Sequence, residues 1–389
     1  MRRLLLGACA LRFLDAFVLI YPFYTVMFAE RGLSAAQIGL VLAAWSLVCL
    51  VLEVPFGVLA DRFSRRWLMS IAQVVRCAGF LVWLAFPNFW GFLVGLMLWG
   101  MKSATLSGAF EAAVFDDLKA RGQEAEYIRV FGRTQAARFA GVVAGALGAG
   151  AAASLGYDAL IWASIATGLG AAAAALALPP APRLTAVRRG GYLAHLRRGA
   201  GEAARLPGVL GLLVFIAAMQ SVVSALADYW PLFGHEVGLP KPAIGLFVAA
   251  ISAVGAVAAA LAHRLRDLPP RVLHGLLMLA GLAIVAAAAS YRAWSVGFLM
   301  AFVGLYWIVD TNADARFQHA LRPETRATVA SVKGLTMQAS TSVLMLSFGL
   351  LAQRSTYQWA FAAYGALLAL VGAGFAAWGL LRLRRPGPL

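Results

Sequence analysis

Ionisable side chains occur inside segments that are otherwise apolar. Arg12 and Asp15 stand in the first such segment, Glu53 in the second, Lys102 in the fourth and Arg138 in the fifth. An ionised group at the centre of a helix in lipid costs about 2.5–3.5 kcal/mol on insertion scales, so such groups are candidates for function. A desolvated carboxylate beside a cation can bind and release a proton. These five residues are therefore candidates for proton coupling or ligand binding.

Asp15 has two alternative roles. Because Arg12 and Asp15 are three residues apart, they share a helix face and can neutralise each other as a structural pair. Alternatively, Asp15 couples proton movement to a conformational change. Near the middle of the expected helices, four cations, Arg12, Arg76, Lys102 and Arg138, stand against this single anion. The excess favours an anionic or zwitterionic ligand, although Arg76 could instead extend along a peripheral helix.

The composition defines the elements that must position these groups. Of 389 residues, 62% are hydrophobic and 13% are charged, whereas soluble domains have about 25% charged residues. A soluble globule is therefore excluded, and no room remains for a separate soluble catalytic domain. Apolar segments long enough to cross a bilayer predict about twelve spans, all helical because lipid cannot satisfy an open backbone. The expected spans are 4–29, 37–60, 67–86, 90–115, 127–152, 157–178, 208–233, 242–264, 271–289, 293–316, 327–352 and 356–381.

The basic residues predict the orientation. The net charge is +16, which in a soluble chain would suggest nucleic acid. With the N-terminus inside, however, 23 of the 33 basic residues fall in inside connections and tails and 4 fall outside. This asymmetry follows the positive-inside rule. It predicts a multi-pass membrane protein with two cytoplasmic termini, and it excludes nucleic acid as a partner. The preference for arginine over lysine, 29 against 4, together with the alanine richness, indicates a bacterial source and therefore a bacterial inner membrane.

An internal repeat divides the spans into two sets. GLSAAQIGLVLAA from Gly32 matches GLPKPAIGLFVAA from Gly238, and LADRF from Leu59 matches LAHRL from Leu261, at offsets of 206 and 202 residues. Such spacing predicts two parallel six-helix halves that alternate access to a midplane site. We expect an N-terminal half over 1–178, a basic cytoplasmic linker over 179–207, and a C-terminal half over 208–389.

Two further sets of acids and bases lie near the expected cytoplasmic ends. Glu111 in the fourth span is at the depth of Arg133 in the fifth, and Asp310 in the tenth is at the depth of Lys333 in the eleventh. The repeat relates the two regions, so we predict ion pairs that latch an inward gate. Asp116 and its neighbour Asp117 are expected at the water boundary as solvated or capping residues.

The segment GVLADRFSRR, Gly57–Arg66, ends the second expected span. Gly57 permits the close approach of a neighbouring helix, and Asp61 can interact with a helix N-terminus or an arginine. Arg62, Arg65 and Arg66 anchor the loop at the cytoplasmic surface. Anchoring alone explains the arginines but not an acid at this spacing, so we predict a gate.

This segment resembles the first signature of the major facilitator superfamily, with Ser64 in place of the usual glycine. LEVPFG, which contains Glu53, and SGAFEAAVFDDL, from Ser107 to Leu118, resemble a bacterial branch of that superfamily. The resemblance covers the whole chain in span number, orientation and repeat. It implies an all-α membrane protein of about twelve helices, and a gate role for the signature. Glu53 could be a proton site or a buried latch.

The resemblance implies proton-coupled efflux of a small amphipathic drug or metabolite by a protein that works as a monomer. Proton-coupled uptake of a small organic anion is the alternative, favoured by the excess of cations. A non-transporting membrane scaffold or sensor, and an intramembrane hydrolase, are alternatives of other classes. The five histidines have no metal-ligand spacing and no phosphate-binding loop is present, so we expect no cofactor, no metal and no enzymatic activity.

Overall fold

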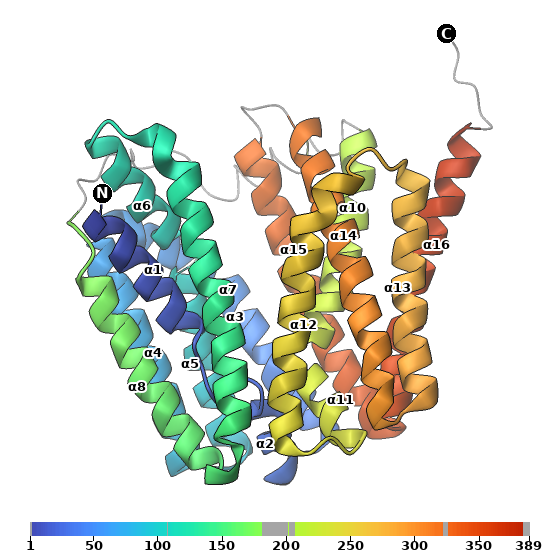
Figure 1. Cartoon of the computed structure of the whole chain (residues 1–389), viewed down its shortest axis with the longest axis horizontal. Helices are drawn as coiled ribbons and strands as arrows, with labels where there is room; N and C mark the ends of the chain where they lie inside the picture. The colour runs from blue at the N-terminus through green and yellow to red at the C-terminus, as the bar shows by residue number, and fades with distance from the viewer. Residues whose placement is uncertain (1, 107, 181–200, 202–206, 322–325, 384–389) are drawn as a thin grey trace. The chain divides into compact units, whose positions relative to one another are not determined.

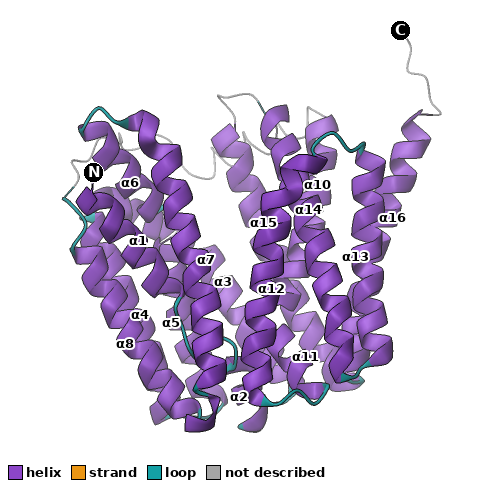
Figure 2. Cartoon of the chain, viewed as in Figure 1, coloured by secondary structure: helices purple, strands orange, loops and turns teal. Residues whose placement is uncertain are grey.

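The computed structural model describes residues 2–106, 108–180, 201, 207–321 and 326–383, and these residues form helices and connecting turns without a strand (Figure 1; Figure 2). The predicted all-α fold is confirmed. The helices before the expected linker are α1 (Arg2–Ala16), α2 (Tyr24–Glu30), α3 (Ala35–Arg62), α4 (Arg65–Ala85), α5 (Phe89–Leu106), α6 (Ala109–Ala120), α7 (Tyr127–Ala151) and α8 (Tyr157–Leu176). Those after it are α10 (Pro207–Ala227), α11 (Trp230–Glu236), α12 (Lys241–Leu261), α13 (Pro270–Ser290), α14 (Val296–Ala320), α15 (Arg326–Arg354) and α16 (Tyr357–Leu383).

The chain forms two compact units. Unit 1 contains Met1–Arg189 with Pro240–Ala249, and unit 2 contains Gly190–Leu239 with Ala250–Leu389. The first turns of α12 therefore belong with unit 1. Most of the expected linker, 181–200 and 202–206, lies outside the described residues.

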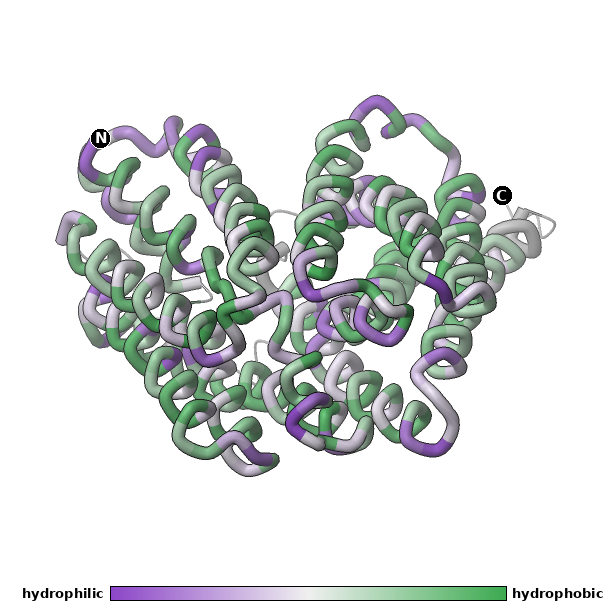
Figure 3. Tube along the Cα trace, turned by 60° about the horizontal axis from the view of Figure 1, so that its bottom comes forward, coloured by the Kyte–Doolittle hydropathy of each residue, from purple (hydrophilic) through white to green (hydrophobic). Residues whose placement is uncertain are grey.

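Ten helical segments of the described chain are long and apolar enough to cross a membrane. The expected first and fifth spans are outside this set, because α1 has only 15 residues and α7 combines Arg138 with many small residues. Hydrophobic residues run along the helices, and hydrophilic residues gather at their ends and in the turns (Figure 3). This distribution is the one that a multi-pass helical membrane protein requires.

Three spans expected to be continuous are interrupted. The first divides into α1 and α2 around Pro22, the fourth into α5 and α6 just before Ala109, and the seventh into α10 and α11 after Ala227. An interruption frees backbone groups that lipid cannot satisfy. In the first span, the Oγ of Ser164 accepts a hydrogen bond from the backbone N–H of Ile20 at 3.0 Å.

The two copies of the repeat have the same backbone geometry. Gly32 and Gly238 have φ angles of +88° and +83°. The following residues, Leu33 and Leu239, each donate a backbone hydrogen bond to the carbonyl five residues earlier, at 3.0 and 2.9 Å. A left-handed glycine followed by this bond ends one helix and redirects the chain into the next. The sequence repeat is therefore a structural repeat at α2–α3 and α11–α12.

Small residues allow close packing of helices within each unit. A Cβ placed on Gly79 would lie 2.6 Å from the carbonyl oxygen of Gly95, and one on Gly141 would collide with the carbonyl oxygen of Phe13. The glycine-rich segment of α7 thus allows close helix packing. This packing brings α1 against α7 and α4 against α5.

Candidate functional site

A cluster of buried ionisable groups lies at the C-terminal end of α1, just before the interruption of the first span. Asp15 forms ion pairs with Lys102 of α5 and with Arg76 of α4, the latter at 3.3 Å between Oδ1 and Nη1. Gln73 of α4 donates a hydrogen bond to the same Oδ1 at 2.8 Å. Arg76 also donates to the backbone oxygen of Asp15 at 2.8 Å. Three helices therefore converge on one carboxylate, and we call these four residues the Asp15 cluster.

The Asp15 cluster is nearly inaccessible and carries one excess positive charge. The side chains of Asp15, Lys102 and Arg76 are 10%, 7% and 0% exposed. The Nε and Nη2 atoms of Arg76 and the Oε1 atom of Gln73 are buried without a hydrogen-bond partner. Unit 1 therefore buries an excess positive charge and polar atoms that could still form hydrogen bonds. Both cost free energy in the folded state.

The structural pair expected between Arg12 and Asp15 is not formed. Arg12 instead donates a hydrogen bond to Gln135 of α7 at 3.0 Å, and its guanidinium lies 5.0 Å from the centroid of the Phe110 ring. Asp15 is turned toward α4 and α5, where two cations are available. The sequence alone could not choose between partners, because a spacing of three residues fixes only the face of one helix.

Aromatic side chains continue from the Asp15 cluster into the interrupted segment. The ring of Trp99, three residues before Lys102, lies 6.4 Å from that of Tyr21 and 6.0 Å from that of Tyr24. Tyr24 and Trp83 are buried, whereas Tyr21 and Trp99 are only half-buried. Most of these rings are therefore core packing, and Tyr21 and Trp99 retain surface that an amphipathic molecule could contact.

The signature segment forms a buried ion pair with α6. Arg65, at the start of α4, forms an ion pair with Asp116 of α6, with 9% and 2% of these side chains exposed. Asp116 is therefore buried and paired, and the expectation of a solvated residue was wrong. Asp117 likewise pairs with Arg121, at 2.7 Å. The Arg65–Asp116 pair joins the start of α4 to α6, and the Asp117–Arg121 pair lies within the C-terminal end of α6.

Other residues of the signature make less contact than predicted. A Cβ on Gly57 would meet no described atom within 4 Å, so the described residues do not include the close helix neighbour expected at this glycine. Arg62 is exposed and Arg66 half-buried. The side chain of Asp61 lies outside the described residues.

Neither of the two predicted latch pairs is formed. Glu111 accepts a hydrogen bond from the backbone N–H of Gly108 at 3.0 Å and thereby caps α6, while Arg133 is exposed on α7. Lys333 of α15 pairs with Asp314, at 2.6 Å, and not with Asp310. The span that carries Glu111 is interrupted, which places this acid at a helix N-terminus where backbone donors are free. Asp314 lies one helical turn after Asp310 and is the acid that Lys333 reaches.

Asp310 has neutral partners instead. Gln220 of α10 donates a hydrogen bond to its Oδ1 at 2.7 Å, and the hydroxyl of Tyr306, one turn earlier on α14, lies 3.5 Å from the same atom. Asp310 is 9% exposed and Tyr306 is 7% exposed. We call these three residues the Asp310 cluster. Glutamine is uncharged and is not an obvious functional residue in an apolar segment, so Gln220 could not be singled out from the sequence.

The remaining candidates, Glu53 on α3 and Arg138 on α7, are both exposed. The structure does not bring either of them into the two clusters. The described part of the chain also contains no group of three or more His, Cys, Asp or Glu side chains that could hold a metal ion.

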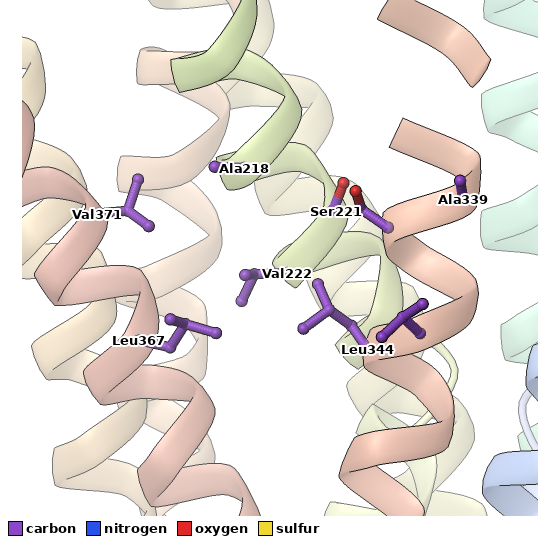
Figure 4. Close-up of a pocket in the computed structure, with 9 residues that line it drawn as sticks. Ala218, Ser221, Val222, Ala339, Leu344, Leu367 and Val371 are labelled. Carbon is purple, nitrogen blue, oxygen red and sulfur yellow. The ribbon is translucent and has the colours of Figure 1, made fainter. Parts of the chain in front are cut away.

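Two cavities lie in unit 2. One, of about 500 Å³, is lined by α10, α15 and α16 (Figure 4). Its lining includes Ser221 and otherwise mostly aliphatic side chains, and it contains no ionisable residue. The other, of about 390 Å³, is lined by α10, α13, α14 and α16 and includes His274 and Arg316. The Asp310 cluster is not part of either lining.

These features define a class of protein, a multi-pass helical membrane transporter with ionisable groups buried among its helices. The profile of the Major Facilitator Superfamily matches residues 5–344, and the chain belongs to this superfamily. It is accordingly a transporter and not an enzyme. The predicted family is confirmed.

Two curated relatives from Escherichia coli (strain K12) are similar over part of the chain. Inner membrane transport protein YajR is 32% identical over 160 residues, which are 39% of this chain and 33% of YajR. Inner membrane protein YqcE is 30% identical over 105 residues, which are 24% of this chain and 25% of YqcE. The matches thus span a third or less of these relatives.

Solved transporters have the same fold. A mutant form of the nucleoside transporter NupG superposes with a TM-score of 0.80 at 12% identity, over 96% of this chain and 99% of NupG. A bacterial homolog of the human lysosomal transporter Spinster, in an inward-facing and unoccupied conformation, gives 0.77 at 17% identity, over 99% and 98% of the two chains. At these identities the similarity shows the fold alone.

Proposed function

We propose that this transporter exports a small amphipathic compound from the cytoplasm across the inner membrane, in exchange for protons. The observation that carries the proposal is the burial of carboxylates among helices in both units, Asp15 in unit 1 and Asp310 in unit 2. A proton-coupled transporter needs ionisable groups that are shielded from water and respond to a proton or a ligand. Because burying such groups costs free energy, their presence inside the helices indicates a function. The part of YajR that this chain matches comes from an inner membrane transport protein, which supports the location.

The half-buried aromatic rings support an amphipathic cargo. Tyr21 and Trp99 lie beside the Asp15 cluster and present both ring surface and a polar atom. A ligand with an apolar body and a polar group could contact the rings and the cluster together. Both termini are placed on the cytoplasmic side in this proposal, as the distribution of basic residues favours.

Uptake of a small organic anion with protons is the second candidate function. One specific observation favours it, the excess positive charge of the Asp15 cluster together with the unpartnered Nε and Nη2 atoms of Arg76. An anionic group on the ligand would neutralise that charge and supply the missing acceptors.

The test is proton movement in proteoliposomes that contain the purified protein and a pH-sensitive dye. A panel of lipophilic cations, zwitterions and organic anions is added under an imposed proton gradient. We expect proton flux opposite to the movement of a cationic or neutral amphiphile. Flux in the same direction as an organic anion would establish the second candidate instead. If no compound of the panel changes the flux relative to empty liposomes, proton coupling is wrong.

A further inference from the structure

The buried carboxylates of the two units have opposite electrostatic environments. Asp15 is held by the cations of Lys102 and Arg76 and by the amide of Gln73. Among the described residues, Asp310 accepts hydrogen bonds from the amide of Gln220 and the phenol of Tyr306, and it is part of no ion pair there. Two positive partners stabilise the ionised form of Asp15, whereas neutral donors compensate a buried negative charge only in part.

The two clusters lie on corresponding helices of the internal repeat, although not at identical positions. Asp15 and Gln220 stand 205 residues apart and Lys102 and Asp310 stand 208 apart, against offsets of 202 and 206 between the repeated segments. In each unit, therefore, a side chain of the first span meets one of the fourth span. In unit 1, α1 supplies the acid and α5 supplies the cation. In unit 2, α10 supplies a neutral amide and α14 supplies the acid. Because of this difference, Asp310 lacks the paired cation that Asp15 has.

The surroundings of Asp310 contain few other charges. Asp314, one turn further along α14, is paired with Lys333 of α15 at 2.6 Å, so its charge is largely compensated. Of the helices packed on α14, α10 carries no acidic or basic side chain within its range. The bases of α13 and of the 3-10 turn after α12 lie near the ends of those elements and are Arg271, His274, His263 and Arg264.

We propose that Asp310 is the group that binds and releases the coupling proton, with Gln220 and Tyr306 holding its carboxyl, and that Asp15 stays ionised as a fixed charge. The inference rests on the proposed proton coupling and names the residue that performs it. A buried carboxylate that lacks a cation lowers its free energy by taking up a proton. With 9% of its surface exposed, Asp310 retains limited contact with the outside of the protein, which proton exchange requires. A proton on Asp310 removes the negative charge that Gln220 and Tyr306 stabilise, so protonation weakens the contact between α10 and α14.

The first experiment measures protonation directly and needs no transported compound. Infrared difference spectra of the full-length protein between acidic and alkaline pH should contain a band from a protonated buried carboxyl. We expect Asp310→Asn to abolish this band, and Asp15→Asn to leave it. As matched controls, Asp314→Asn and Asp267→Asn, the latter at a side chain that is 92% exposed, should also leave it. The proposal is overturned if the infrared band is still present in Asp310→Asn, or if Asp15→Asn is the only variant that loses it.

The second experiment separates this proposal from the proposed function. In the proteoliposome assay, Asp310→Asn should lose proton flux driven by a compound, while Asp267→Asn should keep it. If the wild-type protein moves protons and Asp310→Asn moves as many, the role of Asp310 is wrong while proton coupling stands. If the infrared band belongs to Asp310 and changes with pH, but no compound drives proton flux, then Asp310 binds a proton and the proposed proton coupling is wrong. Gel filtration of each variant excludes misfolding as the cause of a loss.

Discussion

Removing the acid of the Asp15 cluster should destabilise the protein more than removing one of its two cations. In Asp15→Asn, Arg76 and Lys102 remain buried without a counter-ion, and breaking a buried pair in this way costs about 3–5 kcal/mol. In Lys102→Met, Asp15 keeps Arg76 at 3.3 Å and Gln73 at 2.8 Å. The loss is then that of one charged hydrogen bond, up to about 3 kcal/mol. Methionine fills a similar space, and the removal of a desolvated cation beside Arg76 offsets part of the loss.

The double variant tests the electrostatic argument. Asp15→Asn combined with Lys102→Met leaves only Arg76, which still donates to the backbone oxygen of residue 15, a bond of 2.8 Å in the present structure. It should therefore be more stable than Asp15→Asn alone, with a coupling energy of about 1–3 kcal/mol in the double-mutant cycle.

The assay is denaturant unfolding of each variant in detergent, followed by tryptophan fluorescence, because Trp99 lies three residues from Lys102. The free energies of unfolding of the wild type, both single variants and the double variant complete the cycle. Equal destabilisation by Asp15→Asn and Lys102→Met, or a double variant less stable than Asp15→Asn, would refute the account of one acid shared by two cations.

Three further predictions test other parts of the fold. Asp61→Asn should impair transport with normal expression, since a gate residue sets the balance of conformations; unchanged transport rates would remove the gate role. Gly79→Ala should lower the free energy of unfolding by about 1–3 kcal/mol through overpacking, because the new Cβ would lie 2.6 Å from a backbone oxygen. Gly57→Ala is the control and should leave the free energy of unfolding unchanged, because no described atom lies within 4 Å of its Cβ. Lys333→Ala and Asp314→Asn should each cost less than about 1 kcal/mol, because that pair is partly exposed; a larger loss in either contradicts this assignment.

The repeated sequence segments have the same local backbone geometry. Gly32 and Gly238 occupy matching positions in the two copies, and both adopt positive φ angles at the same kind of helix end. Such features depend on a few neighbouring residues, so they can be inferred from the chain. The interruptions of the first and seventh spans were not inferred, because the apolar composition continues through them and hydropathy does not distinguish a helix from a turn.

Partners of ionisable groups were predicted less well than the presence of those groups. Depth along a span suggested Asp310 for Lys333, but one helical turn separates it from Asp314, the acid that Lys333 contacts. A depth estimate uncertain by several residues cannot resolve one turn. Gln73 and Gln220 are neutral and so do not stand out in the sequence, although each donates a hydrogen bond to a buried carboxylate, at 2.8 and 2.7 Å.

The sequence by itself determined that the chain is a helical membrane protein, how its spans are ordered, that it contains a repeat, and that its spans contain ionisable groups. These properties follow from composition and spacing, because lipid imposes the same requirement on every span. Only the tertiary structure decided that Asp15 meets Arg76 and Lys102, and that Asp310 meets Gln220. Those contacts depend on the rotation of each helix about its axis, and helices that are apolar on nearly every face leave that rotation to be set by packing.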